Sequence, residues 1–362
     1  MREQKSVIAS APGKLILMGE HAVVYGRPAL VTSIGLQCRV RVRREQDSGV
    51  RLILPEVGVY AENSWAEIER YTQSAEARWG EYQQQPSAAN YARLRGSDPA
   101  HVVKIALGQS LRWGDIKPKF GICVQVGSAI PPGAGLGSSA AVASATAAAF
   151  LTLCNQQPSV PSLRSIVLDV ERRQHGQASG IDHSCVLSGG LFKAASVGGC
   201  ISLLEMAPTP CLQRMSVYHT GTPNESTGAV VADIAARFEA DPAFKTSLLE
   251  QMESNTLRFY RLLSDPTHCP QAMLEVITEA QRHLEQLGIV PDAVRQVVRE
   301  IESAGGAAKI SGAGALSGTG AGALLVYWPE IPLRLPRGLR RLRRLHTKLT
   351  APGVRIRPEG CL

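Results

Sequence analysis

The stretch Pro131-Pro132-Gly133-Ala134-Gly135-Leu136-Gly137-Ser138-Ser139-Ala140 decides how the rest of the chain is interpreted. Its alternating glycines allow a backbone with positive φ that approaches a ligand closely. The run that follows, 138–154, is nearly all apolar and helix-compatible, so the stretch is predicted to be a loop leading into a helix N-terminus. The unpaired N–H groups and the positive dipole end there predict a bound anion, and a nucleotide phosphate is the best candidate.

Two better-known phosphate loops do not fit this spacing. A Walker A loop needs a Lys directly before its Ser or Thr, and Gly137 holds that position. The dinucleotide-binding fingerprint needs a third glycine three residues after the second, whereas Gly133, Gly135 and Gly137 are two apart. Taken alone, the stretch is equally compatible with a glycine-rich turn that merely starts a buried helix.

The length of 362 residues predicts two lobes, which we place at 1–195 and 196–362. A hydrophobic content of 44% with 19% charged residues is typical of a soluble globular protein, and no apolar stretch reaches the ~20 residues of a membrane span. The N-terminal residues show no secretory signal. The eight cysteines form no C-x-x-C pair, so we expect reduced thiols in a cytoplasmic protein and no zinc site.

Much of the net charge of +8 lies between residues 334 and 357, and within 334–349 arginines and leucines recur at helix-like spacing. This pattern fits either a basic amphipathic helix for anionic lipid or nucleic acid, or a terminal helix that packs its leucines on the body and exposes its arginines. We favour the second interpretation, because no aromatic residues are interleaved for base stacking. Neither a nucleic acid nor a membrane partner is therefore expected.

Two clusters of charged residues flank the glycine-rich stretch in sequence. The first contains Lys14, Glu20 and His21. Residues 11–14 are predicted to form a loop between two strands, so Lys14 ends this loop and Glu20 and His21 follow the second strand. The second contains Glu171, near the end of a predicted helix, and Asp182, in a predicted turn eleven residues later. These two carboxylates fit a metal ligand and a general base, or equally a helix-surface Glu and a turn Asp.

The second half is predicted to be mainly helical up to residue 303, after a strand at 215–219. A second glycine-rich stretch, 305–322, then lies between two strand-like runs. So many glycines in one place indicate that the backbone approaches another part of the protein or a ligand.

Three blocks in order resemble the GHMP kinase superfamily: APGKLILMGEHAVVYG (11–26), PPGAGLGSSAA (131–141) and KISGAGALSGTGAGA (309–323). The first block is most similar to the mevalonate kinase family, and His21 is its most discriminating residue. The resemblance implies an α+β fold of two lobes, the N-terminal one like ribosomal protein S5 domain 2 and the C-terminal one ferredoxin-like. It also implies ATP and Mg²⁺ as cofactors, mevalonate as acceptor, and a homodimer.

The resemblance further implies a role for each matching residue. The loop would wrap the ATP phosphates, and Ser138 or Ser139 would hold Mg²⁺ together with Glu171. Asp182 would be the catalytic base, paired with Lys14 near the acceptor hydroxyl. The substrate side would be formed by Glu20, His21, Thr227, Gly312 and Ala313 together with that pair.

The third block departs from the family pattern, in which a compact Gly-Ala-Gly-Gly-Gly run is common. Here Ala315-Leu316-Ser317 interrupts the glycines, which leaves the acceptor open between mevalonate and similar alcohols such as phosphomevalonate. A non-catalytic, kinase-like binding protein is a further alternative. It is disfavoured because Lys14, Glu171 and Asp182 are all present.

Overall fold

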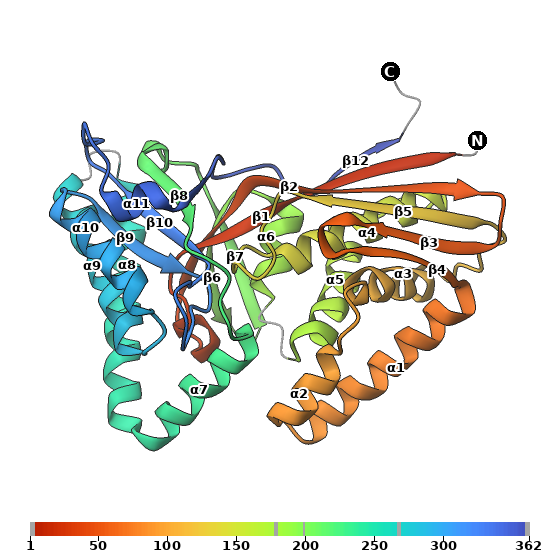
Figure 1. Ribbon diagram of the computed structural model, residues 1–362, viewed down its shortest axis with the longest axis horizontal. Coiled ribbons are helices and arrows are strands. Elements are labelled where there is room, and N and C mark those ends of the chain that lie inside the picture. Colours follow the sequence, from red (N-terminus) through yellow and green to blue (C-terminus); the bar gives the residue numbers. More distant parts are fainter. Residues whose placement is uncertain (1–3, 177–179, 198–199, 266–268, 359–362) are drawn as a thin grey trace.

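The computed structural model describes residues 4–176, 180–197, 200–265 and 269–358. They form two α+β lobes, each built on its own antiparallel or mixed sheet (Figure 1). The predicted two-lobed α+β fold is therefore confirmed.

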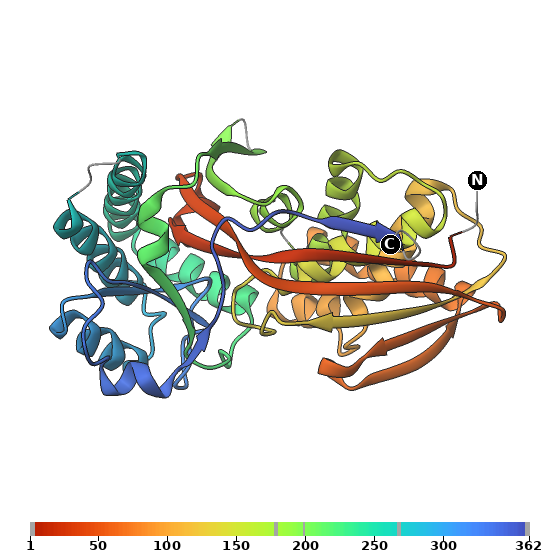
Figure 2. The same cartoon turned by 90° about the horizontal axis from the view of Figure 1, so that it is seen from above.

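The first lobe contains an eight-stranded sheet in the order β12-β1-β2-β5-β3-β4, with β6 paired to β2 and β7 to β6. All its strand pairs are antiparallel except β3 with β5. Helices cover one face of this sheet, and the other face is open in the view from above (Figure 2). The strands are β1 Ser6–Met18, β2 Ala29–Glu45, β3 Gly49–Leu54, β4 Val59–Ser64, β5 Gly121–Ser128, β6 Leu191–Val197, β7 Cys200–Met206 and β12 Arg355–Pro358.

The alanine-rich helix α4 (Ser138–Leu153) forms the centre of the first core and packs against β1 and β2. Its small side chains are almost all buried, which lets the helix lie close to the sheet. The other helices of this lobe are α1 Trp65–Gln84, α2 Ala88–Arg95, α3 His101–Gly114, α5 Val160–His175 and α6 Ile181–Ser188.

The second lobe contains a four-stranded antiparallel sheet in the order β11-β8-β10-β9. Its chain order is β8, a helical segment, β9, β10, one short helix and β11, which is the ferredoxin-like arrangement. The strands are β8 Met215–His219, β9 Ala307–Ser311, β10 Ala323–Tyr327 and β11 Arg343–Leu345. The helices are α7 Thr227–Ala240, α8 Pro242–Ser264, α9 Pro270–Gln286, α10 Asp292–Ser303 and α11 Arg337–Arg341.

The division into lobes at residues 195 and 196 stays a prediction about domains. Two strands that follow it in sequence, β7 and β12, pair within the first sheet. The chain therefore returns from the second lobe to the first at its C-terminal end, where β12 pairs with β1 (Figure 1).

The predicted loop at residues 11–14 is wrong, because β1 runs without a break from Ser6 to Met18. The pairing of β1 with β2 shifts register between Pro12 and Gly13. Such an irregularity accommodates a proline and a glycine inside a strand and bends it locally. Lys14 therefore projects from a strand and not from a turn.

The basic segment is not one long helix, as its spacing suggested. It forms α11 and then β11, which pairs along β8 and completes the edge of the second sheet. Leu339 and Leu345 are buried, while Arg340, Arg343 and Arg344 are exposed. The leucines thus pack on the body as expected, but sheet pairing overrides the helical pattern.

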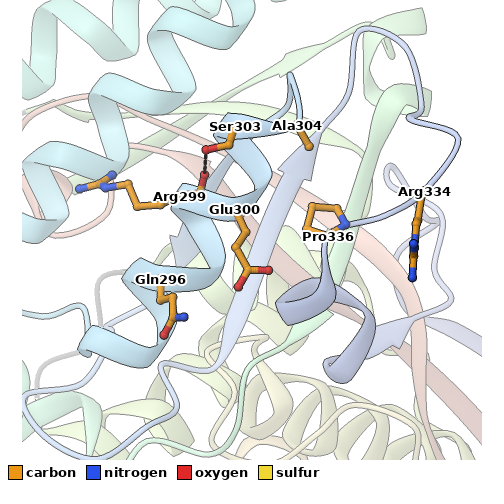
Figure 3. Close-up of a pocket in the computed structure, with 7 residues that line it drawn as sticks. All are labelled: Gln296, Arg299, Glu300, Ser303, Ala304, Arg334 and Pro336. Carbon is orange, nitrogen blue, oxygen red and sulfur yellow. Dashed lines mark hydrogen bonds between the residues drawn. The ribbon is translucent and has the colours of Figure 1, made fainter.

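A shallow hollow lies beside this segment, between α10 and residues 334–336 (Figure 3). Arg299, Glu300 and Ser303 line it from the helix, and Ser303 Oγ donates to the Arg299 carbonyl at 2.8 Å. The Glu300 carboxylate accepts from the Gly338 N–H at 2.7 Å. None of the predicted site residues lines this hollow.

Candidate active site

The predicted loop lies between β5 and α4 and has the backbone expected of an anion-binding loop. Gly133, Gly135 and Gly137 have φ values of 72°, 74° and 70°. Gly137 is the N-cap of α4, and no side chain in the described part of the chain caps this helix end. The first N–H groups of α4 are therefore oriented toward the loop without a side-chain acceptor, as binding of a phosphate requires.

Lys14 connects this loop to the predicted base. Its backbone N–H donates to the Leu136 carbonyl at 2.9 Å, and its Nζ pairs with Asp182 Oδ1 at 3.0 Å. A Cβ on Gly137 would lie 2.7 Å from Lys14 Cγ, so only glycine leaves room for the lysine stem. The lysine side chain is 5% exposed and that of Asp182 is 33% exposed, so the pair opens toward solvent on the carboxylate side.

Asp182 lies in the first turn of α6, not in a turn before a strand as predicted. A carboxylate at this position interacts favourably with the positive end of the helix dipole. Residues 177–179, which lie between Glu171 and Asp182 in sequence, are outside the described residues.

Glu171 is buried on α5, and its burial together with the nearby Asp182 carboxylate raises its pKa to about 8. Its Oε1 has no hydrogen-bond partner among the described residues. Its Oε2 lies 3.8 Å from His175 Nε2, which is 3.2 Å from Ser139 Oγ. Ser139 and Lys14 offset only part of the cost of burying this carboxylate, so the environment fits a bound cation beside the start of α4.

His21 follows β1 in a strained turn. Its φ and ψ are 58° and −46°, and the Ala22 N–H donates to the Glu20 carbonyl at 2.6 Å across it, which makes a γ-turn. Such a backbone costs about 1–3 kcal/mol and persists only where surrounding contacts hold it. One of these contacts joins His21 Nε2 to the Ala313 carbonyl at 3.0 Å.

The ring of His21 is neutral at physiological pH, because burial lowers its pKa to about 4. Since a carbonyl only accepts, Nε2 carries the proton in the contact with Ala313. The neutral ring then has Nδ1 as a hydrogen-bond acceptor.

Glu20 does not stand free beside His21. Its buried carboxylate accepts a hydrogen bond from the ammonium of Lys309 on β9, which also donates to the Ile310 carbonyl at 2.9 Å. Lys309 is not among the site residues predicted from the sequence. The available signal was its position as the first residue of the third block, where it is the only charged residue of the strand.

The glycine-rich stretch after β9 approaches the phosphate loop. A Cβ added to Gly135 would lie only 3.1 Å from the Cα of Gly312. In addition, the Ala323 N–H donates to the Ala134 carbonyl at 3.2 Å. The close backbone approach predicted from these glycines is therefore present. It places Gly312 and Ala313 beside the loop and His21.

Thr227 is the first residue of α7 and is exposed, with Ser226 as its N-cap. Within the described part of the chain, no hydrogen bond or ion pair joins Thr227 to Lys14 or Asp182. Its role near a substrate stays a prediction.

Comparisons with known proteins agree with this architecture. Residues 100–190 match the GHMP kinases N terminal domain. The chain is 29% identical to human mevalonate kinase over 342 residues, which is 85% of this chain and 83% of the human protein. It is also 29% identical to mevalonate kinase of Archaeoglobus fulgidus over 308 residues, covering 85% of this chain and 89% of that protein.

Solved structures resemble the whole fold. Mevalonate kinase from Methanococcus jannaschii superposes with a TM-score of 0.73 at 19% identity, covering 95% of this chain and 98% of that one. Mevalonate kinase from L. major, solved with R-mevalonate, gives 0.70 at 18% identity and covers 95% of each chain. Phosphomevalonate kinase from Streptococcus pneumoniae, solved with phosphomevalonate and AMPPNP, gives 0.67 at 16% identity and covers 94% of this chain and 99% of that one.

The fold, the matched domain and the curated relatives show that the chain belongs to the GHMP kinase superfamily. Within that superfamily, the relatives it is similar to over most of its length are mevalonate kinases. No described helix is long and apolar enough to cross a membrane.

Proposed function

We propose that this chain transfers the γ-phosphoryl group of ATP to the C5 hydroxyl of mevalonate, forming 5-phosphomevalonate and ADP. The observation that carries the proposal is the position of Lys14. Its stem packs on Gly137 at the start of α4, and its ammonium pairs with Asp182. One lysine thus joins a phosphate-binding helix end to a carboxylate that is accessible to an acceptor hydroxyl.

Asp182 acts as the general base. Its carboxylate accepts the proton of the C5 hydroxyl while that oxygen forms a bond to the γ-phosphorus of ATP. The bond from the γ-phosphorus to the bridging oxygen breaks, and ADP leaves. The Lys14 ammonium, 3.0 Å from Asp182, stabilises the negative charge that develops on the attacking oxygen.

The start of α4 holds the nucleotide. Residues 131–140 supply backbone N–H groups and the helix dipole to the phosphates. Ser138, Ser139 and Glu171 would hold Mg²⁺, which neutralises charge on the phosphates when bound. The fit rests on the buried Glu171 oxygen that has no hydrogen-bond partner among the described residues.

The acceptor is assigned from the curated relatives and from the turn at His21. The two curated relatives reported above are mevalonate kinases, and the first block of this chain, which contains His21, resembles the form of that family. Its Nδ1 is available in the neutral ring to accept a hydrogen bond from a substrate hydroxyl. Gly312 and Ala313 form the wall of the acceptor site opposite His21. Glu20 contributes to the acceptor site indirectly, because it is the first residue of the turn that carries His21. The homodimer remains a prediction from the resemblance, and the cytoplasmic location remains a prediction from the scattered cysteines.

An ADP-release assay tests the proposal with ATP, Mg²⁺ and four acceptors: mevalonate, 5-phosphomevalonate, homoserine and galactose. Activity on mevalonate alone supports it. Activity only on 5-phosphomevalonate would make the protein a phosphomevalonate kinase, and ATP binding with no activity on any acceptor would support the kinase-like binding protein.

A further inference from the structure

A buried ion pair joins the two lobes beside the proposed acceptor site. Lys309 on β9 is 0% exposed and Glu20, just after β1, is 2% exposed. Their charged groups form a direct hydrogen bond, although 289 positions separate them in sequence. The two sequence blocks that contain Glu20 and Lys309 are each recognisable, but neither block indicates that these two side chains are in contact.

The pair anchors the turn that carries His21. Glu20 is the first residue of the γ-turn, and its carbonyl accepts from Ala22 across His21. The turn is therefore fixed at two side chains, by Lys309 at Glu20 and by the Ala313 carbonyl at His21. Both fixing groups belong to the third block, in the opposite lobe.

We propose that Lys309 is a positioning residue, which holds the strained turn through Glu20 and so places His21 against the acceptor. Lys309 does not touch the reacting atoms. The inference rests on the proposed function, because it assigns the turn to binding of mevalonate and not of ATP.

A fully buried ion pair is stable only while its two charged groups remain hydrogen-bonded to each other. A buried charge without its partner is strongly unfavourable, so losing either group leaves the other uncompensated. The phosphate loop has separate supports, since Lys14 binds Leu136 and Ala323 binds Ala134 through the backbone. Loss of Lys309 is therefore expected to affect the acceptor side while the nucleotide side stays in place.

The test uses Lys309→Met, Glu20→Gln and the Glu20→Gln/Lys309→Met double variant in the full chain. Arg27→Met is the matched control, because Arg27 follows the same turn and pairs with Glu253 of α8 at the partly exposed edge. For each variant, kcat and the KM values for mevalonate and ATP are measured. Calorimetric binding of mevalonate alone and thermal melting are measured in parallel.

Lys309→Met is expected to weaken mevalonate binding and raise its KM by about 10²-fold, as for a displaced positioning group, with the KM for ATP close to wild type. Arg27→Met is expected to leave both KM values unchanged. If Lys309→Met does not fold, the double variant carries the test, because it leaves no buried charge unpaired and still lacks the anchor.

Four results decide the inference. A wild-type KM for mevalonate in the double variant, or an equal rise in both KM values, would show a purely structural pair and overturn it. The same rise in Arg27→Met would attribute the effect to loosened lobes and overturn it too. A wild-type protein that neither binds nor phosphorylates mevalonate refutes the proposed function itself, and the inference falls with it.

Discussion

At the scale of single residues, the function of each charged group in the candidate site follows from its burial and from whether it has a partner of opposite charge. Lys14 is buried but compensated by Asp182, while Glu171 is buried with one oxygen unpartnered among the described residues. Asp182 is the more exposed of the two carboxylates. The two carboxylates therefore suit different roles. Asp182 is accessible to accept a proton from a substrate, whereas the buried Glu171 requires a cation to balance its charge.

Asp182→Asn should lower kcat by about 10²–10⁴-fold, because an amide cannot accept the hydroxyl proton. ATP binding should be retained, as measured by nucleotide fluorescence titration. Asp169→Asn is the control, since Asp169 has a similar exposure and lies beside Arg172 on α5. Near-normal turnover of Asp182→Asn would falsify its assignment as the base.

Glu171→Gln should raise the Mg²⁺ concentration needed for half-maximal activity. The glutamine keeps the size of the side chain but loses the charge that a cation requires. The readout is a Mg²⁺ titration at saturating ATP and mevalonate. An unchanged titration would return Glu171 to a structural role in α5.

His101 should make the protein less stable in acid. Its buried ring forms hydrogen bonds with Tyr71 Oη at 2.9 Å and with the Arg173 carbonyl at 3.2 Å. This burial lowers the pKa of His101 to about 4. The unfolded chain takes up a proton near pH 6.5 and the folded one does not, so stability falls as pH drops from 6.5 toward 4.

The shift corresponds to roughly 3 kcal/mol as an upper bound. Urea unfolding of wild type and His101→Gln at pH 7 and pH 4.5 measures it. The stability difference between the two proteins should shrink at the lower pH, and a pH-independent difference would contradict the account.

At the scale of elements, the junction of β5, the glycine loop and α4 was predictable. Three alternate glycines before an alanine-rich run leave few other structures, and the loop has the positive φ values that such spacing requires. The continuity of β1 was not predictable, because Pro12 and Gly13 are turn residues in most contexts. Sheet pairing also overrode the helical pattern of residues 334–349.

Gly137→Ala should reduce activity far more than Gly58→Ala. Both glycines have similar φ values, 70° and 69°, so the backbone cost of adding a Cβ is comparable. Only at position 137 would the Cβ meet Lys14, whereas nothing lies within 4 Å of position 58. ADP release and melting temperature separate the two effects. Equal activity losses in the two variants would show that strain alone, and not displacement of Lys14, is responsible.

At the scale of the whole molecule, the site is assembled from both lobes. The three sequence blocks that form the site were recognisable in the sequence. Their resemblance to the family implied the pairing of Lys14 with Asp182, which the structure contains. It did not predict the bond between Glu20 and Lys309 or that between His21 and Ala313. Contacts across hundreds of positions depend on how two lobes pack, and no local pattern of residues encodes that geometry.

The proposed function requires the acceptor atom to be the C5 hydroxyl oxygen of mevalonate. Proton-coupled ³¹P NMR of the product from mevalonate, ATP and Mg²⁺ tests it most directly. The expected product signal is a phosphomonoester triplet, because the C5 oxygen is bonded to a carbon with two hydrogens. A singlet, from the tertiary C3 hydroxyl or the carboxylate, or the absence of any new phosphorus signal, would contradict it.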